Sequence, residues 1–176
     1  MHNESFRLLG LDYVYLCFDV NEETLPAAVA GLKTCGIRGF NLTMPNKNKI
    51  VELLDELSPE AQLIGAVNTV LNDNGKLIGY NTDGYGFMQS VRDAGHDITG
   101  KNITVMGVGG ASMAICAQSA LDGAASVHIF ARRTSRYWNR TQKFAENLSA
   151  KTGCQSASST MMIILHCEIP LHRVIC

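Results

Sequence analysis

The 176-residue sequence lacks several features that would assign it to a specialised class of protein. It has no run of about eighteen or more apolar residues, which argues against a transmembrane helix. Its first residues, MHNESFRLLG, show no basic segment followed by an apolar core, so no secretory signal is indicated. The formal net charge of −1 argues against a nucleic-acid or polybasic membrane surface. We therefore expect a cytoplasmic protein with no nucleic-acid and no membrane partner.

The sequence also lacks a Cys-x-x-Cys pair, although it contains six cysteines. Isolated cysteines in a reducing compartment usually behave as small apolar side chains, so we expect buried free thiols. The residues that invite a metal site lie near the C-terminus, and their spacing matches no common zinc pattern: His166, Cys167, His172 and Cys176. We therefore expect no metal.

What the sequence does contain is a globular composition in which strand and helix patterns alternate, with 46% hydrophobic and 18% charged residues. This alternation predicts an α/β fold. YVYLCFDV at 13–20 predicts a buried strand, a helix follows that ends at Gly36, and residues 38–44 predict the next strand. That order indicates a βαβ unit with two parallel strands.

Further helices and a hairpin are predicted in the rest of the first half. Helical patterns cover about 47–57, 59–64 and 84–95. The turn residues of NDNG at 72–75, between two apolar runs, predict a β-hairpin.

Two boundaries divide the predicted organisation. A domain boundary is expected near residues 96–101, which gives an N-terminal α/β domain over 1–96 and a second domain over 97–150. From about residue 151 the alternation stops, so 151–176 is expected to be an aberrant or loosely ordered tail.

A glycine-rich turn opens the second half. GVGGAS (107–112) follows an apolar strand and opens a helix, where Gly107 permits a tight turn and Gly109 allows a pyrophosphate to approach closely. Free N–H groups at the helix start would hold the phosphates. A plain βα turn is the alternative, but the legible strand, turn, helix and strand indicate a partial Rossmann-type, doubly wound domain.

The end of the next strand bears on which dinucleotide binds. NAD-selective sites usually carry an Asp or Glu there, whereas this sequence has Ala131-Arg132-Arg133-Thr134. Two guanidiniums and no carboxylate favour a 2′-phosphate, which indicates NADP, with NAD left open. A solvated basic turn is the structural alternative for Arg132 and Arg133.

Several polar residues of the first half stand at strand ends or turns among apolar neighbours: Thr43, Lys47, Asn68, Thr82 and Asp83. Each has a structural explanation of its own, such as a buried amide for Asn68 or a helix N-cap for Asp83. Together they indicate a polyol-binding site with one acid–base group. Lys49, two residues beyond Lys47 on the same helix, should point elsewhere into solvent.

Four motifs, in order, place these residues in a family context: NLTMPNK, GAVNTV, GYNTDGYGF and GVGGAS. Over about residues 1–150 the sequence resembles the shikimate dehydrogenase family, including its quinate/shikimate branch. The resemblance implies a substrate-binding α/β domain followed by an NADP-binding domain. It implies an oxidoreductase that interconverts 3-dehydroshikimate and shikimate in the pathway to aromatic amino acids. A homodimer is compatible with it.

The resemblance also implies roles for single residues. Lys47 and Asp83 would form the acid–base pair, and both would contact the substrate together with Thr43 and Asn68. The lysine would give a proton to the substrate oxygen and stabilise negative charge there. The cofactor would be bound by the glycine turn and the following strand end: Gly107, Gly109, Gly110, Ala111, Ser112, Arg132, Arg133 and Thr134.

The sequence departs from the family pattern in three places. Asn46 replaces the histidine that usually precedes the lysine, so a quinate/shikimate dehydrogenase using NAD or NADP is an alternative. The first strand, with the serine loop that binds the substrate carboxylate, is expected to be missing, and so are the later strands of the Rossmann domain. We expect a truncated or frame-shifted end, which an uninterrupted reading frame in the source DNA would contradict. An inactive fragment that binds only nucleotide or a partner chain is a further alternative.

Overall fold

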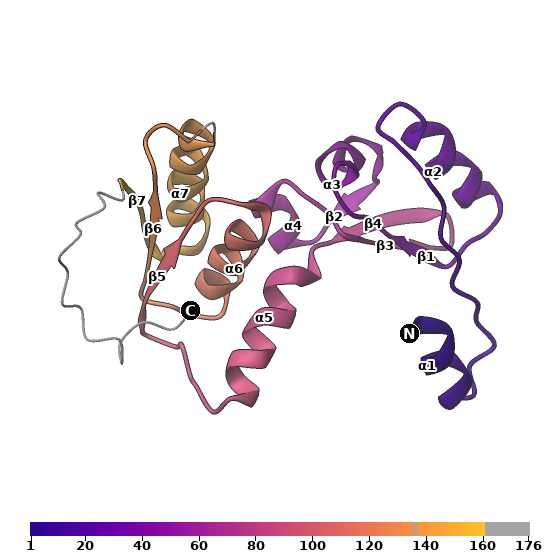
Figure 1. The fold of residues 1–176 in the computed structure, drawn as a ribbon, viewed down its shortest axis with the longest axis horizontal. Coiled ribbons are helices and arrows are strands. Elements are labelled where there is room, and N and C mark those ends of the chain that lie inside the picture. The colour runs from indigo at the N-terminus through magenta and orange to yellow at the C-terminus, as the bar shows by residue number, and fades with distance from the viewer. Residues whose placement is uncertain (136, 161–176) are drawn as a thin grey trace.

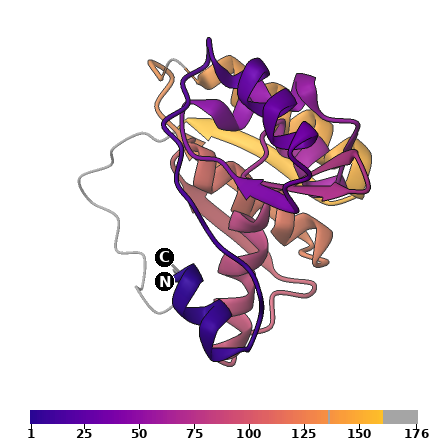
Figure 2. The same cartoon turned by 90° about the vertical axis from the view of Figure 1, so that its right-hand side faces the viewer.

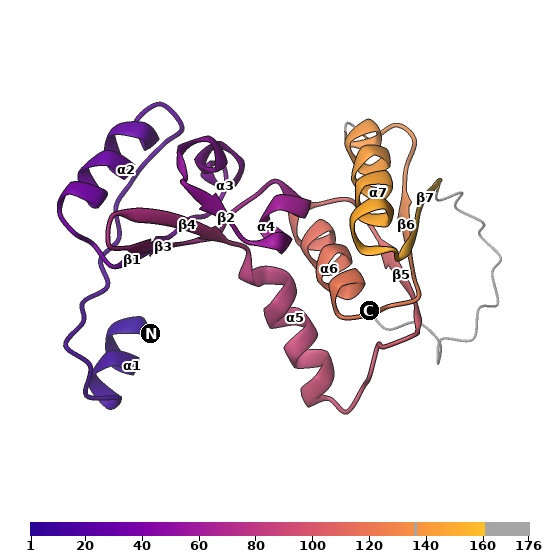
Figure 3. The same ribbon diagram turned by 180° about the vertical axis from the view of Figure 1, so that it is seen from behind.

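A computed structural model describes residues 1–135 and 137–160 of the chain (Figure 1). Helices accompany two separate sheets, with strand orders β1-β3-β4-β2 and β5-β6-β7, so the predicted α/β fold is confirmed. In space the two sheets lie on opposite sides of α5 and α6 (Figures 1 and 3).

The first sheet contains β1 (Gly39–Asn41), β2 (Glu56–Leu57), β3 (Thr69–Asp73) and β4 (Lys76–Tyr80). The predicted hairpin is confirmed, because β3 and β4 are antiparallel neighbours and the turn between them contains Asn74 and Gly75 at φ +52° and +92°. β1 pairs antiparallel with β3, and β2 pairs parallel with β4. β3 is therefore held on both sides, and Asn68 directly precedes it.

The helices of the first half are α1 (His2–Leu8), α2 (Leu25–Thr34), α3 (Asn46–Lys49), the 3₁₀ helix η1 (Ile50–Leu53), α4 (Pro59–Ile64) and α5 (Thr82–Asp93). Gly36, at φ +65°, follows the end of α2 as predicted. The helix predicted over 47–57 is shorter than expected. Leu54 turns to an extended conformation with ψ 147°, because the next residues pair with β4.

The strand predicted at 13–20 is wrong. This segment runs as an extended connection from α1 to α2 (Figure 2) and pairs with no strand in the described ranges. The N–H and carbonyl of Tyr15 bond to the side chain of Asn3 instead. Without a strand at 13–20 the predicted parallel βαβ unit is wrong as well, and β1 pairs antiparallel with β3 instead. Apolar residues alone do not make a strand, because its backbone needs a neighbour to bond.

The second sheet is built from β5 (Asn102–Met106), α6 (Gly110–Leu121), β6 (Ser126–Ala131), α7 (Trp138–Thr152) and β7 (Gln155–Thr160). All its strands are parallel, in the order β5-β6-β7. This order is that of the first half of a doubly wound nucleotide-binding sheet. β7 lies in the segment expected to be a tail, and its polar sequence QSASST gave no strand signal.

One apolar core joins helices of both halves. Met88 and Val91 of α5 pack with Ala114 and Ala117 of α6, and Ile64 of α4 lies in the same cluster. At Gly84 the two helices approach so closely that an added Cβ would overlap the Ala114 carbonyl. α5 thus packs against the second unit, although the domain boundary was predicted after it.

The cysteine prediction is right for two of the four described cysteines. Cys116 and Cys154 are buried, whereas Cys17 and Cys35 are exposed, and all four are free thiols. Burial raises the pKa of the Cys116 thiol to about 12, so this thiol stays protonated and inert.

The described ranges contain no helix long and apolar enough to cross a membrane. They also contain no group of three or more His, Cys, Asp or Glu side chains that could hold a metal ion. The residues considered for a C-terminal metal site, His166, Cys167, His172 and Cys176, lie outside the described residues.

Candidate active site

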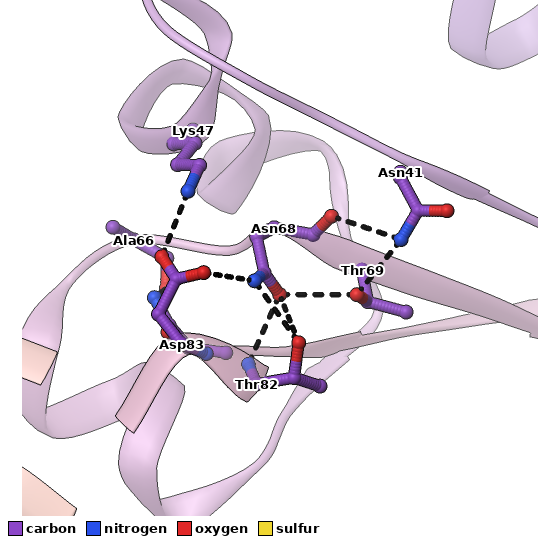
Figure 4. A network of polar contacts seen from close by, with 8 residues as sticks. Asn41, Lys47, Ala66, Asn68, Thr69, Thr82 and Asp83 are labelled. Atoms are coloured by element: carbon purple, nitrogen blue, oxygen red, sulfur yellow. Dashed lines mark hydrogen bonds and ion pairs between the residues drawn. The ribbon is translucent and has the colours of Figure 1, made fainter. Parts of the chain in front are cut away.

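The structure brings Lys47 and Asp83 together from positions 36 residues apart (Figure 4). Lys47 lies on α3 and Asp83 on the first turn of α5, and Lys47 Nζ donates to Asp83 Oδ2 at 2.8 Å. The side chains are 22% and 38% exposed, so the ion pair is partly shielded yet open to a ligand. A charge-assisted contact of this kind fixes both groups relative to each other.

Helix α3 is too short to hold Lys47 by its own hydrogen bonds, so other segments hold it. The peptide bond before Pro45 is cis. The side chain of Asn46 is buried and its Nδ2 donates to the Val20 carbonyl at 2.6 Å. The Lys47 carbonyl accepts from the N–H of Val67 at 2.8 Å. Lys47 is thus held beside the entry to β3.

Asp83 is positioned by the cap of α5. The N-cap residue is Asn81, whose side chain accepts from the Asp83 N–H at 3.2 Å. Asn81 Nδ2 donates to the Ala66 carbonyl at 3.0 Å and ties the cap to the segment before β3. Asp83 is therefore not the cap itself, which was its structural alternative. The helix dipole stabilises its negative charge at this place.

Asn68 connects the acid–base pair to the first sheet. Its Nδ2 donates to Asp83 Oδ1 at 2.8 Å and to Thr82 Oγ1 at 3.0 Å. Its Oδ1 accepts from the Thr82 N–H and from the Thr69 hydroxyl, each at 3.0 Å. The two oxygens of Asp83 thus have different partners, Lys47 on one and Asn68 on the other.

Lys49 and Thr43 lie outside this network. Lys49 pairs with Glu52 at 3.0 Å and is 46% exposed, so the prediction that it points into solvent, away from Asp83, is confirmed. Thr43 is exposed, and its carbonyl accepts from the Asn46 N–H at the start of α3. Thr43 therefore lies next to the helix that carries Lys47.

The glycine turn has the predicted strand–turn–helix form. Gly107 has φ +113°, and its N–H donates to the Phe130 carbonyl of β6 at 2.9 Å. Gly109 is the N-cap of α6, and the Ser112 hydroxyl donates to its carbonyl at 2.8 Å. The N–H groups of the first helical residues, Gly110 to Ser112, have no partner earlier in the helix. They are available to an anion.

The predicted cofactor residues of the next strand end lie at the same edge of the sheet. Arg132, Arg133 and Thr134 directly follow β6 and are exposed. β5 and β6 are parallel neighbours, so the ends of both strands, and the turns after them, meet at one edge. The residues at this strand end, Ala131 to Thr134, include no carboxylate.

Sequence reasoning missed two residues of the polar network, Asn41 and Thr69. Thr82 was counted among the residues of the predicted polyol site, but without a role of its own. Asn41 Nδ2 donates to Thr69 Oγ1 at 3.0 Å. The signal that could have found them is position, because Asn41 ends a strand and Thr69 directly follows Asn68.

This arrangement contains the groups that acid–base chemistry needs. The Lys47 ammonium can give a proton to a developing alkoxide, and the carboxylate beside it holds the ammonium in place. The glycine turn and helix start suit a dinucleotide. Fold and site together combine a lysine–carboxylate pair with a Rossmann-type unit in an α/β protein, an arrangement typical of nicotinamide-dependent dehydrogenases.

Comparison with known proteins identifies the family. Residues 1–70 match the shikimate dehydrogenase substrate binding domain. A shikimate dehydrogenase (NADP(+)) of Listeria monocytogenes is 51% identical over 156 residues, which cover 89% of this chain and 53% of that protein. The chain belongs to the shikimate dehydrogenase family. It spans about half the length of the curated relatives it matches.

Solved structures share the fold. Shikimate 5-dehydrogenase of Listeria monocytogenes, in complex with shikimate and NAD, gives a TM-score of 0.87 at 48% identity, over 90% of this chain and 55% of that chain. The ligand-free 5-ketofructose reductase of Gluconobacter sp. strain CHM43 gives 0.83 at 35% identity, over 91% and 56%. By their names, the first is a dehydrogenase and the second a reductase.

Proposed function

We propose that this chain carries the substrate site and acid–base pair of an NADP-dependent dehydrogenase that interconverts 3-dehydroshikimate and shikimate. The observation that carries the proposal is the 2.8 Å contact between Lys47 Nζ and Asp83 Oδ2, in a chain of this family. Helix α3 carries two lysines, and the side chain of Lys47 is 22% exposed whereas that of Lys49 is 46% exposed. Lys47 is thus the more shielded of the two, as an acid–base group in a binding site should be.

In the reducing direction Lys47 is the proton donor. NADPH, when bound, supplies the hydride that adds to the carbonyl carbon of the substrate. As negative charge develops on the carbonyl oxygen, the Lys47 ammonium stabilises it and then transfers one proton to it. In the oxidising direction the neutral amine takes that proton back. Asp83 accepts from Lys47 throughout and can accept from a neighbouring substrate hydroxyl.

The substrate hydroxyls would be bound by Thr43, Asn68 and Asp83. Thr43 is exposed beside α3, with its hydroxyl available to a ligand. Asn68 already donates to Thr82 and Asp83, so a substrate hydroxyl would take the place of Thr82 in that contact. A hydroxyl that bridges Asn68 and Asp83 would orient the ring against Lys47.

The residues at the edge of the second sheet fit NADP. The N–H groups of Gly110, Ala111 and Ser112 would bind the pyrophosphate, and the glycines at 107 and 109 leave open space for it. Arg132 would pair with the 2′-phosphate, with Arg133 or Thr134 beside it. A carboxylate that would repel this phosphate is absent from the strand end.

A quinate/shikimate dehydrogenase that uses NAD or NADP is the second candidate. Asn46, which stands where the family usually has a histidine, supports this candidate, because it changes the side chain next to Lys47. Its side-chain amide donates to the Val20 carbonyl. The Listeria structure that contains shikimate with NAD also makes NAD use worth testing.

The test is formation of reduced nicotinamide by the purified chain, with shikimate or quinate and with NADP or NAD. The proposal predicts turnover with shikimate and NADP that exceeds every other combination. Comparable turnover with quinate or NAD would favour the second candidate. No turnover in any combination, with nucleotide binding retained, would identify an inactive fragment. Reduction of 5-ketofructose by NADPH, in a parallel assay, would instead point to a keto-sugar reductase.

A further inference from the structure

We infer that Thr69 and Asn41 are positioning residues that fix which end of the Asn68 side-chain amide faces Asp83. The inference rests on the proposed function for its catalytic meaning, but its structural content is independent of activity. An amide has a donor end and an acceptor end of nearly the same shape, so its neighbours must choose between them. Here the choice follows from the hydrogen bonds alone.

The first part of the chain of hydrogen bonds begins at a backbone carbonyl. Asn41 and Thr69 are direct partners in the β1–β3 ladder, so their side chains meet. Asn41 Nδ2 contacts the Asn68 carbonyl at 3.5 Å and Thr69 Oγ1 at 3.0 Å. A carbonyl can only accept, so the donor end of Asn41 faces this side and donates to Thr69. The single hydroxyl proton of Thr69 is then free for Asn68 Oδ1, 3.0 Å away.

The second part begins at a backbone N–H. The Thr82 N–H, which can only donate, lies 3.0 Å from the same Oδ1 of Asn68. Two donors from different elements, Thr69 on β3 and Thr82 on α5, thus meet the acceptor end of Asn68. The donor end must face the opposite way, toward Asp83 Oδ1 at 2.8 Å. Figure 4 shows this chain of contacts from Asn41 to Lys47.

The fixed orientation determines what the site can bind. With its donor end toward Asp83, Asn68 stabilises the carboxylate, and its second N–H, which donates to Thr82 Oγ1, is the one that a ligand oxygen would take over. A reversed amide would place Oδ1 against the Asp83 carboxylate, where two acceptors repel. Asn68 is 91% buried by the protein, with an exposed fraction of 9%, so water is poorly placed to replace a lost partner. Thr69 and Asn41 therefore act on the ligand and on Asp83 through Asn68.

The test measures how fast the Asn68 side-chain amide protons exchange with water, by nuclear magnetic resonance on the 176-residue chain. The signal is assigned by its absence in Asn68→Asp. Thr69→Val keeps the shape and the strand propensity but removes the hydroxyl, and should accelerate exchange about tenfold, the factor that one lost hydrogen bond implies. Thr69→Ser should restore the parent rate. Thr34→Val, which removes an exposed hydroxyl bonded to the Ala30 carbonyl of its own helix, is the control.

A second pair of variants separates orientation from packing. Asn41→Asp replaces the donor by a carboxylate that accepts the Thr69 proton and so takes it away from Asn68. Asn41→Ala leaves Thr69 free to donate to Asn68. We expect faster exchange in Asn41→Asp than in Asn41→Ala. The reverse order, or an unchanged rate in Thr69→Val, would overturn the inference.

Turnover of the same variants separates this inference from the proposed function. If the parent chain turns over shikimate, Thr69→Val should raise KM for shikimate and leave KM for NADP unchanged, and Thr69→Ser should restore both. If the parent chain shows no turnover, the proposed function fails while the exchange rates still test the role of Thr69.

Discussion

The carboxylate of Asp83 has a separate protein partner on each oxygen, and this arrangement decides what the residue can do. Lys47 lies at 2.8 Å from Oδ2 and Asn68 at 2.8 Å from Oδ1. Both partners donate, so Asp83 acts as an acceptor and a charge balance for Lys47. In the proposed reaction the proton that moves would therefore belong to Lys47, while Asp83 and Asn68 would orient the substrate.

Arg132 tests the cofactor preference at the residue scale. Arg132→Ala should weaken NADP binding by roughly tenfold or more, since one charge-assisted hydrogen bond contributes about 1.5–3 kcal/mol. NAD binding should change little, because NAD has no 2′-phosphate. Titration of each nucleotide into the variant measures both affinities. Arg140→Ala, which removes an exposed arginine of α7, is the matched control, and equal losses for NADP and NAD would contradict the assignment.

At the scale of elements, α5 has two tasks, since its first turn holds Asp83 and its side packs on α6. Two glycines of α5, Gly84 and Gly86, allow the effect of packing on stability to be distinguished from the effect of helix propensity. A Cβ at Gly84 would overlap the Ala114 carbonyl and lie 2.9 Å from Gln118 Cβ, whereas a Cβ at Gly86 would meet nothing within 4 Å. The close approach at Gly84 brings the Asp83 end of α5 against the second unit.

The two glycine substitutions should therefore have opposite effects on stability. Gly84→Ala should lower the free energy of unfolding by roughly 1–3 kcal/mol through overpacking. Gly86→Ala should raise it by about 0.5–1 kcal/mol, because alanine is the better helix former. Denaturant unfolding of both variants measures the difference. Destabilisation of equal size at both positions would show that the α5–α6 contact is looser than described.

Asp55, which lies just before β2 and accepts from the Leu77 N–H of β4, should make the stability of the fold depend on pH. The backbone N–H of Leu77 and then the side chain of Lys33 hold the pKa of Asp55 below its ordinary value of 3.8. A lowered pKa means that the charged form stabilises the fold. The contribution is present above the ordinary value and is lost as pH falls through the folded-state pKa.

Unfolding measured across the acid range tests this element. The parent chain should lose stability as pH falls from about 4 toward 2, and Asp55→Asn should lose less over the same interval. Lys33→Ala should retain most of the pH dependence, because the Leu77 N–H remains at 2.7 Å from Asp55. Parallel curves for the parent and Asp55→Asn would contradict the role given to this carboxylate.

The elements that sequence predicted best are those whose partners are close in the chain. The β3–β4 hairpin, α5 and the strand–glycine turn–helix of β5 and α6 follow from local turn residues and apolar spacing. The strand predicted at 13–20 failed because strand pairing is not local: its residues are apolar, but no described strand pairs with it. β7 was missed because its polar sequence has no strand pattern, although backbone hydrogen bonds to β6 hold it as a strand.

At the scale of the whole molecule, the site depends on contacts between segments far apart in sequence. The sequence motifs indicated Lys47, Asn68 and Asp83 together, through the resemblance to a known family, and the structure places Lys47 and Asn68 each in contact with Asp83. Asn41 and Thr69 were beyond reach, because their meeting depends on the register between β1 and β3. Motifs indicate the residues proposed to carry the chemistry, and the strand register shows which residues meet them.

The measurement that tests the central claim most directly compares Lys47→Ala with Lys49→Ala in the shikimate and NADP assay. The two lysines share one short helix, but only Lys47 contacts Asp83, while Lys49 pairs with Glu52 at the surface. We expect Lys47→Ala to lower kcat by at least about a hundredfold, the usual contribution of a proton-transfer group, and Lys49→Ala to leave it near the parent value. Equal rates in the two variants, or a parent chain without turnover, would contradict the account.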